Sequence, residues 1–245
     1  MQLTQKKRQR TDLLTVAAVA ALFVVMAALL YTGHLTRQVT NMLVPVAVYI
    51  VMAVSLNLVV GLLGELSLGH AGFMSIGAFA GSALALALQS TVTLSPLRLA
   101  LAMVFGAVIA AALGFLIGIP VLRLNGDYLA IVTLAFGEIV KNVMNACYLG
   151  VDSHGLHFSL KDSASLNLET DGKVLINGAM GITGIKKAST FTIGIVLVII
   201  TLLVILNLVN SRAGRAIKAI RDNEIAARSV GIPITKYKLM AFVTS

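Results

Sequence analysis

The stretch TFTIGIVLVIITLLVILNLVN (residues 190–210) runs without a break into SRAGRAIKAIRDNEIAARSVGIPITKYK (residues 211–238). The first part is as long and as apolar as one membrane-spanning helix, which needs about 20 residues to cross a hydrocarbon core of about 30 Å. The second part is basic and rich in small residues, as soluble helices are. This sequence predicts a membrane span followed directly by a helical segment outside the bilayer, where another protein can push on it.

The composition of the 245-residue chain is that of a polytopic membrane protein. Hydrophobic residues make up 58% and charged residues 12%, against about half and about a quarter in average soluble domains. The mean hydropathy is +0.94. The single cysteine, Cys147, allows no internal disulfide. We therefore expect an all-α fold, a polytopic transmembrane helical bundle.

Apolar windows of sufficient length predict about six spans and the start of another. They lie at residues 13–31, 42–63, 66–88, 97–119, 128–149 and 190–210. The expected organisation is a basic N-terminus at 1–12, transmembrane helices 1–5 at 13–149, an external loop at 150–189, transmembrane helix 6 at 190–210, a cytoplasmic loop at 211–236, and the start of a truncated helix at 237–245. Because the last segment turns apolar and then stops, we expect further spans to be missing.

Basic residues set the orientation of such spans, because loops rich in Lys and Arg stay in the cytoplasm. If the N-terminus is cytoplasmic, 12 of the 19 Lys and Arg residues face the cytoplasm, 6 face outward and Lys141 lies within a span. The cytoplasmic set has four members between Lys6 and Arg10, then Arg123, then seven between Arg212 and Lys238. This bias predicts a cytoplasmic N-terminus. The long polar loop at 150–189 is then expected to fold outside as a small cap.

The cytoplasmic loop at 211–236 has the pattern of two short helices. A narrow apolar stripe recurs at helical spacing in the first, at Ala213, Ile217 and Ile220, and such a stripe is expected to dock on another surface. Asp222 is placed to cap the second helix, which we expect from about Asn223 to Val230. Gly231, followed by Pro233, is a typical C-terminal stop.

Three blocks of sequence carry a family resemblance. They are SLNLVVGLLGELSLGHAGFMSIGAFAG (55–81), LNGDYLAIVTLAFGEIVKNV (124–143) and GRAIKAIRDNEIAARSVGI (214–232). Together they resemble the LivM-type permeases of branched-chain amino acid ABC importers. The third resembles the loop by which importer permeases contact their ATPase, a Glu-Ala-Ala run with a glycine after it, although Ile225 displaces Glu224 by one position. The resemblance implies ATPase coupling through Gly214, Arg215, Ala219, Glu224, Ala226, Ala227 and Gly231.

The resemblance also implies a location, a transport function and partners. The chain would be a permease subunit in a prokaryotic plasma (inner) membrane, moving branched-chain or other small amino acids inward. Its partners would be a LivH-type permease, two ABC ATPase subunits, an extracytoplasmic substrate-binding protein and membrane lipid. Contact with nucleic acid is not expected.

Enzymatic chemistry is not indicated by the motifs. The sequence has no GxxxxGK[ST] phosphate loop, and the nearest approach is GITGIKKAST at residues 181–190. We therefore expect no cofactor in this chain, with ATP bound by partner subunits. His154 and His157 form an HxxH spacing, but no third ligand is suitably spaced, so a metal site is not expected.

Two other interpretations remain open. A urea or short-amide importer permease would resemble the same family. The segment EIAARSVGIPITKYK also resembles a helix-turn-helix, and a membrane-tethered regulator would place Lys236 and Lys238 on DNA phosphates. The regulator is disfavoured because its recognition helix would run into the apolar AFV at 241–243 and because the other two blocks would go unexplained.

Two groups of residues are candidates for a translocation path. The block GLLGELSLGHAG (61–72) should interrupt a helix, and its candidates are Gly64, Glu65, Ser67, Gly69 and His70. Non-helical backbone at membrane depth needs a cover of protein or water, although close packing through small residues is the simpler explanation. The second group is Glu138 and Lys141, opposite charges at i,i+3 within a span. A structural pair is favoured there over contact with a zwitterionic substrate.

Overall fold

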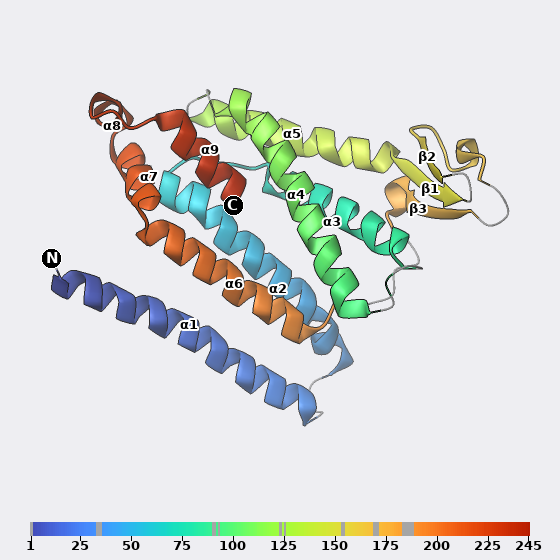
Figure 1. The fold of residues 1–245 in the computed structure, drawn as a ribbon, viewed down its shortest axis with the longest axis horizontal. Coiled ribbons are helices and arrows are strands. Elements are labelled where there is room, and N and C mark those ends of the chain that lie inside the picture. Colours follow the sequence, from blue (N-terminus) through green and yellow to red (C-terminus); the bar gives the residue numbers. More distant parts are fainter. Residues whose placement is uncertain are drawn as a thin grey trace. The chain divides into compact units, whose positions relative to one another are not determined.

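The computed structural model describes residues 2–32, 36–89, 92, 94–122, 124, 126–152, 155–168, 172–182 and 189–245. Long helices dominate these residues (Figure 1). The helices are α1 (Gln2–Tyr31), α2 (Arg37–Asn57), the π-helical η1 (Leu58–Leu63), α3 (His70–Ala87), α4 (Ser95–Val121), α5 (Asp127–Ala146), α6 (Phe191–Asn210), α7 (Arg212–Asp222), α8 (Glu224–Ser229) and α9 (Ile234–Thr244). The chain is a helical, polytopic membrane protein, as the composition predicts.

Five helices in the described ranges are long and apolar enough to cross a membrane. They comprise Arg37–Leu63, His70–Ala87, Ser95–Val121, Tyr128–Ala146 and Phe191–Asn210. The first expected span, residues 13–31, falls within α1, whose apolar part Leu14–Leu30 is shorter. The part of the chain that the structure describes thus contains five long candidate spans and one shorter apolar helix, where six spans were expected.

The chain packs as two compact units, and the first contains residues 2–64 and 189–237. Within it α6 lies against α2, and α1 also contacts α6 (Figure 1). A side chain at Gly194 of α6 would collide with Ala47 of α2, 2.8 Å from its Cβ atom. The two helices are therefore closely packed through small residues, as membrane helices commonly are.

The second unit contains residues 65–188 and 238–244. Its helices α3 and α4 are in intimate contact, because a Cβ atom at Gly81 would lie 2.8 Å from the carbonyl oxygen of Ala102. The end of α9 belongs to this unit, where Phe242 packs edge-on against Phe73 with ring centroids 5.4 Å apart. Leu239 fills the space beside Gly118 of α4. Residues 238–244 are thus anchored among α3 and α4.

A small sheet follows α5 in the region where a folded cap was expected. Its strands are β1 (Tyr148–Asp152), β2 (Gly155–Ser159) and β3 (Lys173–Asn177), with two short 3₁₀ turns at Ala164–Leu166 and Gly178–Met180. The strands are antiparallel in the order β2-β1-β3. Because β1 begins at Tyr148, α5 ends at Ala146, before the limit of residue 149 that apolarity alone suggested.

Candidate functional site

The first helix of the cytoplasmic loop, α7, is fixed to its own unit. Ser211 is its N-cap, and its hydroxyl accepts a hydrogen bond from the Gly214 amide at 3.1 Å. Ile217 and Ile220 are buried, and α7 contacts both α6 and η1. The predicted apolar stripe therefore docks inside the chain. Burial of two isoleucines stabilises this contact by about 1.5–3 kcal/mol each.

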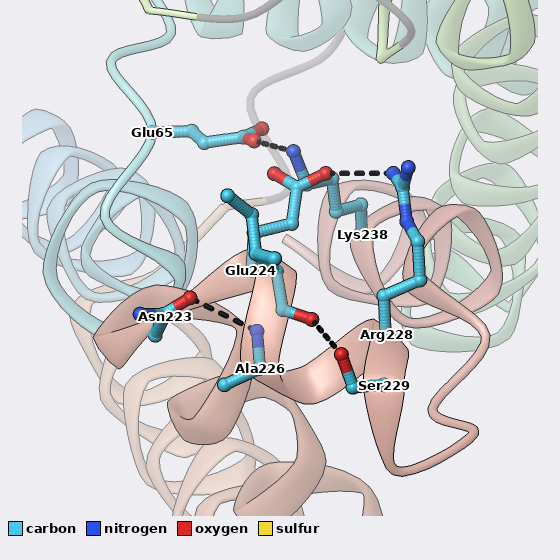
Figure 2. Close-up of polar contacts among 8 residues, drawn as sticks. Glu65, Asn223, Glu224, Ala226, Arg228, Ser229 and Lys238 are labelled. Atoms are coloured by element: carbon cyan, nitrogen blue, oxygen red, sulfur yellow. Dashed lines mark hydrogen bonds and ion pairs between the residues drawn. The ribbon is translucent and has the colours of Figure 1, made fainter.

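The second helix, α8, has defined caps at both ends. The prediction that Asp222 caps it was wrong, because Asp222 is the last residue of α7 and the cap is Asn223. The extended backbone of Asn223, with φ −160°, turns its side chain back, and its Oδ1 accepts from the Ala226 amide at 3.0 Å (Figure 2). At the other end Gly231 is left-handed, with φ +81°.

The C-terminal stop of α8 is a Schellman motif. The Gly231 amide donates to the Arg228 carbonyl at 3.0 Å, and the Ile232 amide donates to the Ala227 carbonyl at 3.1 Å. Both bonds satisfy carbonyls that the end of a helix would leave without partners. A six-residue helix is marginal alone, so these caps are what hold α8 in one conformation.

Two large apolar side chains are exposed at α8, one within the helix and one at its C-cap. Ile225 is 80% exposed and Val230 is 76% exposed, whereas Ala227 is buried. Glu224 and Arg228 form an ion pair of 3.2 Å along the helix (Figure 2). Among the large hydrophobic residues that the structure describes, these two are the most exposed.

The sequence-predicted coupling residues divide between the two helices. Glu224, Ala226 and Ala227 form α8, and Gly231 ends it, whereas Gly214, Arg215 and Ala219 belong to α7. Gly214 is buried where a side chain would collide with the carbonyls of Leu208 and Val209. Gly214 therefore serves the tight turn from α6 into α7. None of these positions is tested as a contact with an ATPase, and all remain predictions in that role.

Arg221 of α7 reaches the end of η1 within the first unit. Its Nη1 donates to the carbonyl oxygen of Gly61 at 2.8 Å, and the two residues are 160 positions apart in the sequence. Gly64 follows η1 in the left-handed conformation, with φ +80°, and a Cβ atom there would lie 2.9 Å from Cγ of Arg221. A cation at a helix C-terminus satisfies its last carbonyls and its dipole.

Glu65 and Lys238 form an ion pair within the second unit (Figure 2). The Nζ atom of Lys238 lies 2.5 Å from Oε1 of Glu65, and the side chains are only 4% and 14% exposed, respectively. Each is the first residue after a crossing of the chain from the first unit to the second. Because Lys238 is buried and paired, it is not available to DNA phosphates as the regulator interpretation requires.

The rest of the glycine-rich segment packs against α5. The Leu68 amide donates to Oγ1 of Thr133 at 3.1 Å, and a Cβ atom at Gly69 would lie 2.7 Å from the Thr133 carbonyl. Ser67 is buried, and His70 begins α3. The interruption expected in this block is present between Leu63 and His70. The close approach of the backbones explains the small residues by packing.

Glu138 and Lys141 lie on α5, with Nζ and Oε2 3.2 Å apart. Their side chains are 59% and 63% exposed, and both line a hollow of about 360 Å³ between α3 and α5. Leu68, from the glycine-rich segment, lines the same hollow. The two candidate groups therefore meet at this hollow through Leu68.

Metal ligation finds no support in the part of the chain that the structure describes, where no group of three His, Cys, Asp or Glu side chains is suitably placed. His154 lies outside the described residues. The Nε2 atom of His157 lies 3.0 Å from a carboxylate oxygen of Asp152. That contact joins neighbouring strands of the small sheet.

Sequence reasoning missed four residues that define this site. Ile225 was noted only as displacing Glu224, and Val230 only as the end of a helix, yet Ile225 of α8 and Val230 at its C-cap are exposed apolar side chains. Arg221 was counted only among the cytoplasmic basic residues, and Lys238 was considered only in that count and for DNA phosphates, although each makes a specific contact. The available signal was a lone charge beside apolar sequence, as in YKLMAF at 237–242. Such a charge usually has a partner.

Comparison with known proteins identifies related sequences. Residues 38–245 match the family described as branched-chain amino acid transport system / permease component. Two similar relatives bear the name high-affinity branched-chain amino acid transport system permease protein LivM. The chain is 36% identical to that of Salmonella typhimurium over 213 residues and 35% identical to that of Escherichia coli over 212 residues.

Each comparison covers 81% of this chain and 47% of the relative. The chain thus spans about half the length of the curated relatives it matches. No solved structure matches it.

Proposed function

The chain belongs to the permease family of branched-chain amino acid transport systems, and we propose that it is a transmembrane permease subunit of an ABC importer. It moves branched-chain or other small amino acids inward, and its partner subunits bind and hydrolyse ATP. The observation that carries this proposal is α8, a short helix with both ends capped and with Ile225 and Val230 exposed. The relatives' names supply the substrate class.

The docking surface for an ATPase is α8 and not α7. The apolar face of α7 is already buried within the chain, so it has little left to offer a partner. Ile225 and Val230 are the apolar anchors that α8 can place in a groove, and exposed apolar residues of a helix are the usual contacts of that binding mode. In the proposed assembly two ATPases bind this chain and a LivH-type permease, and an extracytoplasmic protein delivers the substrate.

The proposed orientation has the N-terminus and α8 in the cytoplasm. The basic residues between Lys6 and Arg10 and those after Arg212 support it, because both clusters then lie on the side favoured for Lys and Arg. The span Phe191–Asn210 leads directly into α7 and α8, so the ATPase-binding helix is attached to a helix that crosses the inner membrane.

A force that an ATPase exerts on α8 can be transmitted to the rest of the chain through two contacts. On one side Arg221 of α7 holds the Gly61 carbonyl, and on the other Lys238 of α9 holds Glu65. Both contacts end on residues 61–65, at the end of η1 and the start of the interruption. We infer that closure of the ATPases is transmitted through these contacts to the spans on either side of the interruption.

The experiment measures ATP hydrolysed per amino acid transported in a complex reconstituted with its partner subunits. Gly231→Val should hydrolyse ATP but transport less, because a β-branched residue at φ +81° is strained and distorts the end of α8. Gly231→Asn is the matched control, since Asn tolerates this conformation. Wild-type coupling in Gly231→Val would count against the docking role of α8.

A second variant pair tests the apolar anchor. Ile225→Asp should lose ATPase binding, whereas Ile225→Val should retain most of it, and both should fold because the side chain is exposed. Binding is measured by co-purification of the tagged ATPase. Competition of labelled leucine uptake by amino acids, urea and short amides then separates the proposed substrate class from the amide alternative.

A further inference from the structure

The hollow between α3 and α5 combines apolar walls with one pair of opposite charges. It has a volume of about 360 Å³, within the range of small-molecule sites. Its apolar lining includes Leu68, Phe79 and Leu134, and its polar lining includes Ser75. All of these residues belong to one packed unit, since α3 and α5 lie in contact along Gly72 and Gly137. The hollow is therefore a feature of a single unit.

The charges in this hollow are unusual for their position. Glu138 and Lys141 lie inside the apolar span Tyr128–Ala146, yet more than half of each side chain remains exposed in this chain. Charged groups in hydrocarbon cost several kcal/mol, and they therefore face a protein interior or a water-filled cavity. An exposed pair on this face therefore indicates that protein or water, and not lipid, lies beside this part of α5.

The arrangement matches the charges of an α-amino acid. An α-amino acid carries its ammonium and its carboxylate on the same carbon atom, and Glu138 and Lys141 offer a carboxylate and an ammonium 3.2 Å apart. Because both side chains are more than half exposed, a zwitterion can reach them. Two ion pairs, one from Glu138 to its ammonium and one from Lys141 to its carboxylate, can then replace the contact between the two side chains. The aliphatic side chain then has Leu68, Phe79 and Leu134 beside it.

We propose that the hollow between α3 and α5 binds the translocated amino acid, with Glu138 receiving its ammonium group and Lys141 its carboxylate. This proposal rests on the proposed function and deepens it by naming residues that contact the substrate. It requires both charges of the ligand. An amine that lacks the carboxylate leaves Lys141 without a contact to the ligand. An acid that lacks the ammonium does the same to Glu138.

The test uses a thiol placed in the hollow as a reporter of occupancy. Ala71 is exposed and lines the hollow, so Ala71→Cys should react with N-ethylmaleimide in membranes that hold the complete complex. The native Cys147, whose thiol pKa is raised by burial, is replaced by serine in every variant. Ala164→Cys, exposed in the small cap, is the control reporter.

Leucine should slow the reaction of Ala71→Cys and leave that of Ala164→Cys unchanged. The rate should fall about tenfold when leucine is present at about ten times its dissociation constant. Isoamylamine and 4-methylpentanoate, which each lack one of the charges, should protect much less. Equal protection by all three compounds would overturn the role of the charge pair.

Charge-removing variants assign the two contacts. In Glu138→Gln, 4-methylpentanoate should protect nearly as well as leucine, because the ammonium no longer gains a partner. In Lys141→Met, isoamylamine should do so. A merely structural ion pair would leave the ratio between leucine and each analogue unchanged, and this result would also overturn the proposal.

The failure of this proposal is distinguishable from failure of the proposed function. If uptake of leucine is normal but Ala71→Cys is not protected, the chain is a permease and the substrate passes elsewhere. If Ala71→Cys reacts slowly with or without leucine, protein or lipid fills the hollow and the proposal is overturned. Absence of ATP-dependent amino acid uptake in the unsubstituted complex would instead refute the proposed function.

Discussion

Removing the ammonium of Lys238 should destabilise the chain strongly. In Lys238→Met the carboxylate of Glu65, now 14% exposed, would stay in the same buried place without its cation. Breaking a buried ion pair from one side costs about 3–5 kcal/mol. For a chain of this size each kcal/mol lowers the melting temperature by about 2–4 °C, so a fall of about 6–20 °C is expected in detergent.

The double variant Glu65→Gln/Lys238→Met separates stability from coupling. Replacing both charges leaves no buried charge, and such replacements are often close to neutral, so most of the melting temperature should return. The mechanical link would still be absent, so transport per ATP should remain low. The control Arg228→Gln breaks the exposed pair with Glu224 and should cost only about 0.3–0.5 kcal/mol.

The large cost expected for Lys238→Met would be refuted if its melting temperature fell by only about 2–4 °C, which corresponds to about 1 kcal/mol. That result would mean that other groups stabilise the buried carboxylate of Glu65 when Lys238 is replaced. Full coupling in the stable double variant would leave the pair as a packing feature and would remove it from the transmission route.

Three further variants test the local structure. Asn223→Ala should cost about 1 kcal/mol and speed hydrogen exchange of the amide that it caps, whereas Asn223→Ser should cost little. Gly64→Ala should cost about 1–3 kcal/mol, measured by thermal unfolding, because its φ is +80° and Arg221 occupies the space of the added methyl. Ile217→Ala should cost about 2–5 kcal/mol because this side chain is fully buried, whereas Ile225→Ala, 80% exposed, should stay within about 0.5 kcal/mol in the same measurement.

Most of the helical fold follows from the sequence because each span is a local property. An apolar window of adequate length identifies the part of a helix that can lie in the hydrocarbon core, and all five long spans lie at such windows. It does not report where the helix ends. Thus α2 begins at Arg37, in polar sequence before the predicted residue 42, and α5 ends at Ala146 because β1 pairs with β3 immediately afterwards.

The site was less predictable because its decisive contacts are long-range. The cap at Asn223 was displaced by one residue because Asp222 and Asn223 have equally suitable side chains, and the extent of α7 decides between them. The bond from Arg221 to Gly61 joins residues 160 positions apart. No local pattern predicts such a partner, and helical periodicity places Arg221 only off the apolar stripe of Ala213, Ile217 and Ile220.

Residues 61–65, at the end of η1 and the start of the interruption, are contacted by one cation from each segment that flanks α8, Arg221 of α7 and Lys238 of α9. The helix α8 buries Ala227 but exposes Ile225, and Val230 at its C-cap is exposed as well, so few of its side chains pack against the rest of the chain. Its caps make it stiff. In the proposed mechanism a force that the ATPase exerts on α8 is therefore transmitted to its neighbours α7 and α9. Each neighbour supplies one cation to the interruption.

A continuous helix across residues 61–65 would offer these cations no partner of the same kind. Its carbonyls would be satisfied internally, whereas the end of η1 leaves the Gly61 carbonyl for Arg221. The left-handed Gly64 turns the chain directly after η1, and Glu65 follows it to meet Lys238. In the proposed mechanism the glycine-rich block is therefore the receiving end of the coupling loop, and its variants should impair coupling before they impair substrate binding at the hollow between α3 and α5.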